Sequence, residues 1–423
     1  MVTWRAKRGV MTSGLVILLA AAGCGDDETG RQDVATSGAT DTATSGDGTA
    51  TTTTVGDTSV APDTEPPPDT TSVASETVED SSVAVETSED TSKLDVPTTE
   101  TTTPPPEVRF IVMGDTGEGN DRQKKVAQAI VGACSRLGCD HVMLTGDNIY
   151  DAGVEGVLDA QWQSKFEVPY KDVDLPFYAV LGNHDNGGFL SQVFGDTFGG
   201  AGAEFERGDH QVAYSQVSEK WKMPDRVYDW VAGPAHFFAL DTNDMVWGVL
   251  VESAEQRVEI VSDTVPALID ESTATWKIAF GHHPYRSNGR HGNAGSYEGL
   301  EEDIGDLIAA VPIVGDLGPT IQGKGVKEGL EAIVCGRVDI YFSGHDHNRQ
   351  WFPEEQSGAC AGTTLVVSGA GAKLTEFKKT QPTLFQDDQK AGFFWVHLKG
   401  KQIFVEAIDE DGQSQWTYQG EKP

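Results

Sequence analysis

The chain has 423 residues and a formal net charge of −35, with 66 acidic and 31 basic side chains. A surface field of this sign repels the phosphate backbone of nucleic acids, so nucleic-acid binding is excluded from the expected functions. The composition changes near residue 106, which divides the chain into an N-terminal part and a domain.

The first 24 residues predict an export signal. Arg5, Lys7 and Arg8 precede the apolar stretch LVILLAAAGC, which ends in small residues and Cys24. About ten apolar residues are too few to span a membrane, and they suit a secretory signal peptide. The A-A-G-C sequence is similar to a bacterial lipobox, in which Cys24 becomes the lipid-carrying first residue; plain secretion is the alternative. We therefore expect an exported protein, membrane-anchored through Cys24 as a bacterial lipoprotein or extracellular.

Residues 25–106 are rich in Thr, Ser, Asp, Glu, Pro and Ala and contain no aromatic side chain. Eighteen acidic residues against Arg31 and Lys93 give this segment −16 of the net charge. Such a composition buries too little apolar surface to offset chain entropy, so we expect a disordered linker. Its like charges extend it, and it can hold the following domain ~50 Å or more from a membrane.

Residues 107–423 are long enough for one large α/β domain or for two. In this part, five short apolar runs end in glycine followed at once by Asp, Asn or His: RFIVMGD, HVMLTGDNIY, FYAVLGNHD, WKIAFGHH and DIYFSGHDH. Such runs predict buried strands, and ligands gather beyond the carboxyl ends of strands in an open α/β sheet. We expect the glycines to turn the backbone sharply and to leave room at the site. They are Gly114, Gly146, Gly182, Gly281 and Gly344.

Three further strands are predicted towards the C-terminus, at 363–371, 392–400 and 402–409. A tight Gly-Lys turn separates the last two strands, which predicts a β-hairpin. Strands therefore continue beyond the fifth apolar run.

The five strand ends carry seven side chains that are typical metal ligands: Asp115, Asp147, Tyr150, Asn183, His282, His345 and His347. A single zinc ion takes four ligands, so seven donors suit two ions. Oxygen donors mixed with imidazole favour iron, manganese or zinc. Two metal ions about 3.5–4 Å apart can clamp both oxygens of an in-line phosphoryl displacement. Asp147 is the natural bridge, because a carboxylate has two oxygens and can serve both ions.

The order GD, GDNxY, GNHD, GHxP, GHDH resembles the metallophosphoesterase (calcineurin-like) superfamily and, within it, the small tartrate-resistant purple acid phosphatases. The resemblance runs from about Val108 to Gly371. It implies a four-layer α/β/β/α sandwich with the metals at one edge. It also implies hydrolysis of a small phosphate monoester, and we expect a monomer. Two alternatives remain, namely a phosphodiesterase or nucleotidase on the same site, and a non-enzymatic surface-binding module on the same fold.

One departure from the wider superfamily favours the purple subtype. Ordinary metallophosphoesterases have Asp-x-His in the first motif, whereas this chain has Asp-Thr-Gly at 115–117. Tyr150 restores the missing donor, and a phenol with a pKa near 10 becomes a phenolate ligand beside a strongly acidic ion. The resemblance therefore implies two metal ions, Fe(III) and a divalent iron, zinc or manganese.

Carried over residue by residue, the family's arrangement divides the ligands between the two ions. The ferric ion is held by Asp115, Tyr150 and His347. The divalent ion is held by Asn183, His282 and His345. Asp147 bridges them, and His184 and His291 match the family's catalytic, substrate-side histidines. His283 fills a slot where we expect Tyr in the closest relatives, and we assign it no role.

Four cysteines remain besides Cys24, and none of them lies in a metal motif. In an exported domain four cysteines allow three pairings. We favour Cys134–Cys139 and Cys335–Cys360, because each pair encloses a short local loop.

Overall fold

The computed structural model describes residues 105–187, 202, 204–248, 252–297 and 322–423. The predicted signal peptide with Cys24, and the predicted linker as far as residue 104, lie outside the described residues. Within those residues, no helix is both long enough and apolar enough to cross a bilayer.

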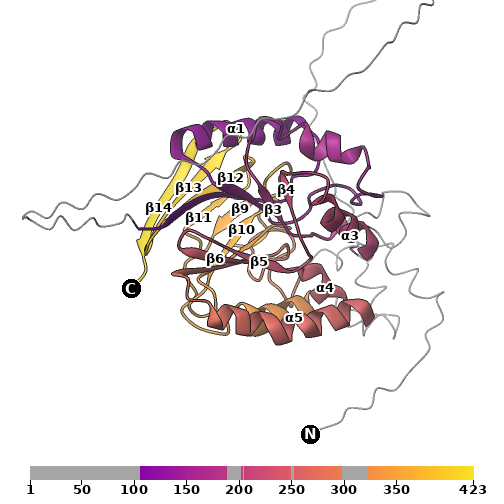
Figure 1. The fold of residues 1–423 in the computed structure, drawn as a ribbon. Helices are drawn as coiled ribbons and strands as arrows, with labels where there is room; N and C mark the ends of the chain where they lie inside the picture. Colours follow the sequence, from indigo (N-terminus) through magenta and orange to yellow (C-terminus); the bar gives the residue numbers. More distant parts are fainter. Residues whose placement is uncertain (1–104, 188–201, 203, 249–251, 298–321) are drawn as a thin grey trace, which may run out of the picture. The chain divides into compact units, whose positions relative to one another are not determined.

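Two seven-stranded mixed sheets form the centre of the domain (Figure 1). The first sheet has the order β14-β13-β12-β1-β2-β3-β4, and the second has the order β11-β9-β10-β8-β7-β6-β5. The strands of the first sheet are β1 (Glu107–Met113), β2 (His141–Leu144), β3 (Phe177–Ala179), β4 (Trp221–Lys222), β12 (Gly392–Lys399), β13 (Gln402–Asp409) and β14 (Ser414–Glu421). The strands of the second sheet are β5 (Tyr228–Ala232), β6 (Ala235–Ala239), β7 (Trp276–Phe280), β8 (Ile340–Ser343), β9 (Arg349–Trp351), β10 (Thr364–Ser368) and β11 (Phe385–Asp387).

Alternating side chains of β1 show how the layers are held together. Phe110 and Val112 pack into the core between the two sheets, where they meet residues of β6, β7 and β8. Ile111 and Met113 pack into the core on the opposite face of the first sheet. A strand exposes successive side chains on opposite faces, so an apolar run of this kind is buried on both sides.

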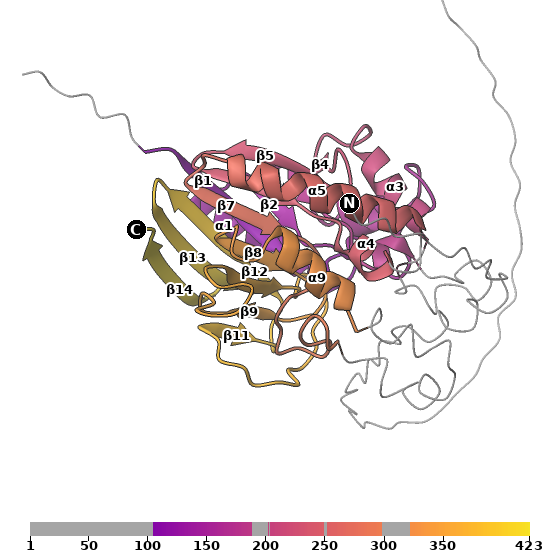
Figure 2. The same cartoon turned by 90° about the horizontal axis from the view of Figure 1, so that it is seen from below.

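Helices cover the outer face of each sheet (Figures 1 and 2). The helices of the described residues are α1 (Asp121–Leu137), the π-helix η3 (Trp162–Glu167), the 3₁₀ helix η4 (His184–Asn186), α3 (Phe205–Tyr214), α4 (Thr242–Trp247), α5 (Glu252–Glu271) and α9 (Lys324–Ile333). α1 begins after Asn120, whose side chain accepts the backbone N–H of Gln123 as an N-cap. α1 packs on the first sheet, and α5 and α9 pack on the second. The predicted α/β/β/α sandwich is confirmed.

The predicted strands and disulfides are also confirmed. The five apolar runs form β1, β2, β3, β7 and β8, and the strands predicted towards the C-terminus form β10, β12 and β13. β12 and β13 pair antiparallel as a hairpin. Cys134–Cys139 joins the end of α1 to the residues before β2, and Cys335–Cys360 joins the residues after α9 to those before β10.

Candidate metal centre

Three of the predicted ligands have a left-handed backbone directly after a strand. The φ angles are 56° at Asp115, 50° at Asp147 and 71° at His345. In the part of the chain that the structure describes, these are the non-glycine residues with positive φ. This conformation costs on the order of 1–3 kcal/mol and persists where the surroundings enforce it, which is typical of functional sites.

The glycines before the ligands provide space more than conformational freedom. Of the five, Gly146 alone has a positive φ, of 91°, and after Gly114 and Gly344 the left-handed residue is the ligand that follows. A Cβ atom on Gly182 would lie 2.1 Å from Asp147 Oδ1, and one on Gly344 would lie 2.5 Å from Asp115 Oδ2. A ligand side chain fills the space beside Gly146, Gly182 and Gly344, whereas Thr145 fills it beside Gly114 and Thr242 beside Gly281. The glycines therefore leave room for the neighbouring strand ends, as expected.

Asp115, Asp147, Tyr150 and His347 form one buried group of donor atoms. The Tyr150 hydroxyl lies 3.1 Å from Asp115 Oδ1, 2.9 Å from Asp147 Oδ2 and 3.2 Å from His347 Nε2. Two ligands that bind one ion at about 2.1 Å and at right angles are themselves about 3 Å apart. The group therefore has the dimensions of one metal coordination shell.

Asn183, His282 and His345 form the second group, again with Asp147. Asn183 Oδ1 lies 2.9 Å from His282 Nε2 and 3.1 Å from His345 Nδ1, and the two imidazole nitrogens are 3.1 Å apart. Asp147 Oδ2 lies 3.4 Å from His282 Nε2. The structure thus brings all seven predicted ligands together at one edge of the two sheets.

Asp147 lies in both groups, but through one oxygen. Oδ2 faces both Tyr150 and His282, whereas Oδ1 accepts the backbone N–H of His184 at 2.9 Å. We expected the two carboxylate oxygens to serve one ion each. The geometry instead places a single oxygen between the two donor groups, because the other oxygen accepts the backbone N–H of the GNHD loop.

The protonation pattern shows that this site fits cations. The Nδ1 atom of His282 donates to the Thr145 carbonyl at 2.9 Å, because a carbonyl can only accept, so Nε2 carries the lone pair in the neutral ring. Burial lowers the pKa of His282, but the charges of Asp147 and Asp115 outweigh burial and raise it to about 9. Without metal the cluster therefore attracts a proton, and metal uptake must release it. The donor types and their burial fit a pair of metal ions.

His184 lies beside the first group, with its ring centroid 4.4 Å from that of Tyr150. Its Nδ1 donates to the Asp151 carbonyl at 2.6 Å, which leaves Nε2 as the second ring nitrogen. In the neutral ring Nε2 has no proton. His184 can therefore donate a proton through Nε2 only as an imidazolium.

His291 lies beside the second group and stacks on His345, with ring centroids 4.0 Å apart. Its backbone N–H donates to Asp346 Oδ1 at 2.9 Å, which fixes the loop that carries it. His283 is buried and its Nδ1 lies 2.9 Å from the Thr242 hydroxyl. That hydroxyl oxygen already accepts the backbone N–H of His282 and of His283, so it donates to Nδ1.

Sequence reasoning missed the aspartates that hold these loops. The Asp185 carboxylate accepts the backbone N–H groups of Gly182 at 2.8 Å, Asn148 at 2.9 Å and Ile149 at 3.0 Å, so it ties the second and third motifs together. Burial and the charge of Asp147 raise the pKa of Asp185 to about 6. Asp185 lies in the GNHD motif and Asp346 in the GHDH motif. An acidic residue next to a ligand was therefore the sequence signal that could have identified them.

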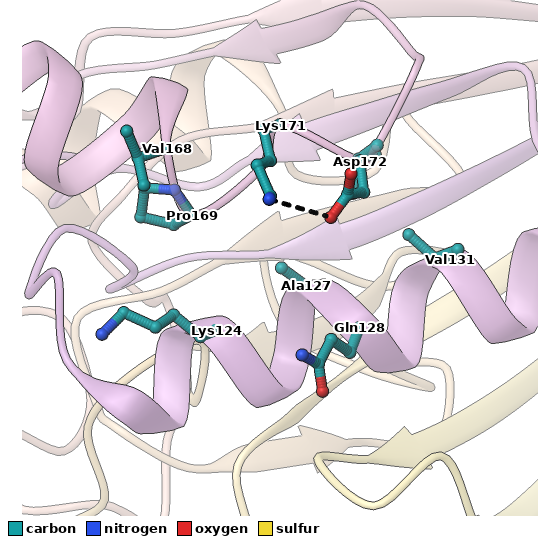
Figure 3. A pocket seen from close by; sticks show the side chains of 9 residues that line it. Lys124, Ala127, Gln128, Val131, Val168, Pro169, Lys171 and Asp172 are labelled. Atoms are coloured by element: carbon teal, nitrogen blue, oxygen red, sulfur yellow. Dashed lines mark ion pairs between the residues drawn. The ribbon is translucent and has the colours of Figure 1, made fainter.

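A small pocket lies away from the metal centre. It has a volume of about 180 Å³ and lies between α1 and the residues after η3 (Figure 3). Lys124, Val131, Val168 and Lys171 line it, and Lys171 pairs with Asp172 at 3.9 Å. None of the predicted site residues lines this pocket, so it is separate from the metal centre.

Comparisons with known proteins agree with this geometry. The sequence matches the calcineurin-like phosphoesterase family over residues 108–349. Purple acid phosphatase 7 of Arabidopsis thaliana is 27% identical over 323 residues, which cover 70% of this chain and 82% of the relative. Tartrate-resistant acid phosphatase type 5 of Homo sapiens is 25% identical over 346 residues, which cover 73% of this chain and 89% of the relative. A solved structure described as GAP50, the anchor in the inner membrane complex of Plasmodium, is 18% identical with a TM-score of 0.52. The match covers 75% of this chain and 89% of that structure's chain. That structural likeness concerns the fold alone.

Proposed function

Because the chain belongs to the calcineurin-like phosphoesterase family, we propose that it is a dinuclear metal phosphatase that hydrolyses phosphate monoesters. The observation that carries the proposal is the pair of buried donor groups that share Asp147. The similarity to purple and tartrate-resistant acid phosphatases supports it. A non-enzymatic module with a decayed site would have lost at least one ligand, whereas all seven are present and converge.

We propose that the two ions are Fe(III) and a divalent iron, zinc or manganese. Tyr150 supports this assignment, because its hydroxyl lies among two carboxylates and an imidazole at the distances of a ligand. Asp115, Asp147 and a Tyr150 phenolate bring three negative charges against five on the ions, which leaves about two positive charges for a phosphate dianion. The ions would supply a hydroxide nucleophile and hold the phosphoryl group between them.

The two histidines outside the ligand set act on the substrate. His184 lies at the side of the Tyr150 group, and His291 lies over His345 at the side of the other group. They would flank a phosphate held between the two donor groups, where a doubly protonated ring can donate to a phosphate oxygen or to the leaving alkoxide.

A comparison of a monoester with a diester tests the proposed function. We expect the full-length protein to hydrolyse nitrophenyl phosphate with a higher kcat/KM than bis(nitrophenyl) phosphate. A site that contacts the free oxygens of a dianion loses part of that interaction with a diester monoanion. Faster turnover of the diester would replace the monoesterase by the phosphodiesterase alternative, and no turnover of either would favour the binding module.

Replacing His184 or His291 with Ala is expected to lower turnover by about 10²–10⁴-fold, the range for loss of a positioned proton donor. Neither side chain is a ligand, so metal content should stay near that of the parent. The deficit should be larger for alkyl phosphates than for nitrophenyl phosphate, whose leaving group hardly needs a proton. His210→Ala, in α3, is the matched control and should leave turnover unchanged.

Two results would reject the acid role. If His184→Ala loses metal, the residue is a ligand. If the deficit is equal for good and poor leaving groups, the residue anchors phosphate instead. Steady-state kinetics with a series of leaving groups, together with metal analysis of each variant, distinguishes these outcomes.

We propose that the protein is exported and held at a membrane by lipidation of Cys24. The proposal rests on the A-A-G-C sequence after a short apolar stretch. The full-length protein should enter the detergent phase and label with a fatty-acid probe, and Cys24→Ser should do neither. Equal partitioning and equal labelling of the two proteins would leave plain secretion as the explanation.

A further inference from the structure

Lys373 lies over the ring of Tyr150, although it is not among the predicted site residues. Its ammonium nitrogen is 4.1 Å from the centre of the Tyr150 ring. The same nitrogen pairs with Glu118 Oε1 at 3.1 Å, and 11% of the Lys373 side chain is exposed. The charge is therefore held against the ring and largely removed from solvent.

The backbone around Lys373 is fixed to two of the ligand motifs. The Gly371 N–H donates to the Gly114 carbonyl at 3.0 Å, directly before the ligand of the first motif. The Thr375 N–H donates to the His347 carbonyl at 2.9 Å, in the last motif. Lys373 stands between these two hydrogen bonds, so its position is set by the same loops that carry the ligands.

We propose that Lys373 tunes the metal centre by withdrawing electron density from the Tyr150 phenolate. The inference deepens the proposed function and rests on its ferric iron assignment. A cation over the face of an aromatic ring attracts the ring's electrons, and the attraction is stronger where water is excluded. The phenolate is then a weaker donor, and outer contacts of this kind set the acidity of the ion that a ligand binds.

The pairing with Glu118 favours tuning over direct binding of phosphate. A lysine that anchors phosphate needs its ammonium free to reach the substrate, whereas Glu118 already occupies one side of this ammonium and the Tyr150 ring another. A carboxylate beside the ammonium also opposes the approach of a second anion.

The visible absorption band of the metal-loaded, full-length protein tests the inference. The band reports the energy needed to move an electron from the phenolate to the ferric ion. Lys373→Met removes the charge and keeps most of the side chain, so the band should move to longer wavelength by about 10–20 nm. The acidic limb of the pH–rate profile should move to higher pH, because a less acidic ion yields hydroxide less readily.

Two further variants serve as controls. Lys373→Arg keeps the charge, so its band should lie within a few nanometres of the parent's band. The shift should be about a quarter of the Lys373→Met shift or less. Lys422→Met removes another lysine that lies over an aromatic ring, 5.2 Å from the centre of Trp276, and should leave the band unchanged. If Lys373→Met binds less metal than the parent, Lys373→Gln is the second neutral variant, and the same shift is expected.

The outcomes separate this inference from the function on which it rests. A colourless parent that contains two metals overturns the iron assignment, and the tuning role with it. A coloured parent whose band stays in place in both neutral variants overturns the tuning role alone. In that case, a raised KM with an unchanged band would make Lys373 a phosphate anchor.

Discussion

Asp147→Asn is expected to lower turnover of nitrophenyl phosphate by several orders of magnitude, because a metal clamp contributes several kcal/mol to the transition state. Asp147 Oδ2 faces the Tyr150 hydroxyl at 2.9 Å and His282 Nε2 at 3.4 Å, so it is the atom that the two donor groups share. The amide keeps the shape of the side chain and removes the negative charge that a bridge between two cations needs. Steady-state kinetics with metal analysis measures both effects.

Asp172→Asn is the matched control for this change. The Asp172 side chain is 75% exposed and lies at the pocket beside α1, outside the metal centre. The same chemical change there should leave turnover and metal content at the level of the parent. Asp147→Asn activity within tenfold of the parent would show that the bridge is misassigned.

Tyr150→Phe is expected to abolish the visible band, because it removes the only phenol oxygen that lies among the donor atoms of the described site. The ring itself should stay in place, since it contacts both Lys373 and His184. We expect the variant to fold and to hold less iron than the parent, as the ion loses one of its ligands. The absorption spectrum and the iron content of the purified protein are the measurements.

Tyr228→Phe controls for the loss of a buried hydroxyl. The Tyr228 hydroxyl donates to the Ala179 carbonyl at 2.8 Å, and its partly buried ring packs against the core between the sheets, so this change should lower stability slightly and leave the colour intact. A colourless and fully active parent that holds zinc or manganese alone would contradict the iron assignment. It would leave the hydrolase assignment standing.

The sequence predicts which candidate ligands converge because each one lies within about six residues of the end of a buried strand. β1, β2, β3, β7 and β8 are apolar runs that end in glycine, so the pattern marks both the strand and its carboxyl end. Parallel pairing of β1 with β2 and of β7 with β8 then brings the strand ends to one edge. The local signal and the tertiary arrangement agree, and this is why the site is readable from motifs.

Other elements carry no comparable signal. β9 has three residues and contains Arg349, whose fully buried guanidinium donates to the Ile408 carbonyl at 2.9 Å. β14 is largely exposed, with the sequence SQWTYQGE, and it is a strand because β13 pairs with it. Pairing with neighbouring strands makes these segments β-strands, and intrinsic propensity alone does not identify them.

The finer chemistry of the site depends on contacts between residues far apart in the chain. The tautomer of His282 is set by the carbonyl of Thr145, 137 residues earlier. Asp147 faces both donor groups with a single oxygen because the N–H of His184 occupies the other oxygen. Such partners are known only once the loops are placed in space, so motif spacing predicts the ligand set and not the proton or oxygen that each ligand uses.

Reconstitution of the metal-free protein tests the central claim most directly. Chelation should abolish turnover of nitrophenyl phosphate, and iron added together with zinc or manganese should restore it. Because two donor groups share Asp147, turnover should reach its plateau at two metal ions per chain. Full turnover with one ion per chain, or in the chelated protein, would contradict a dinuclear phosphatase.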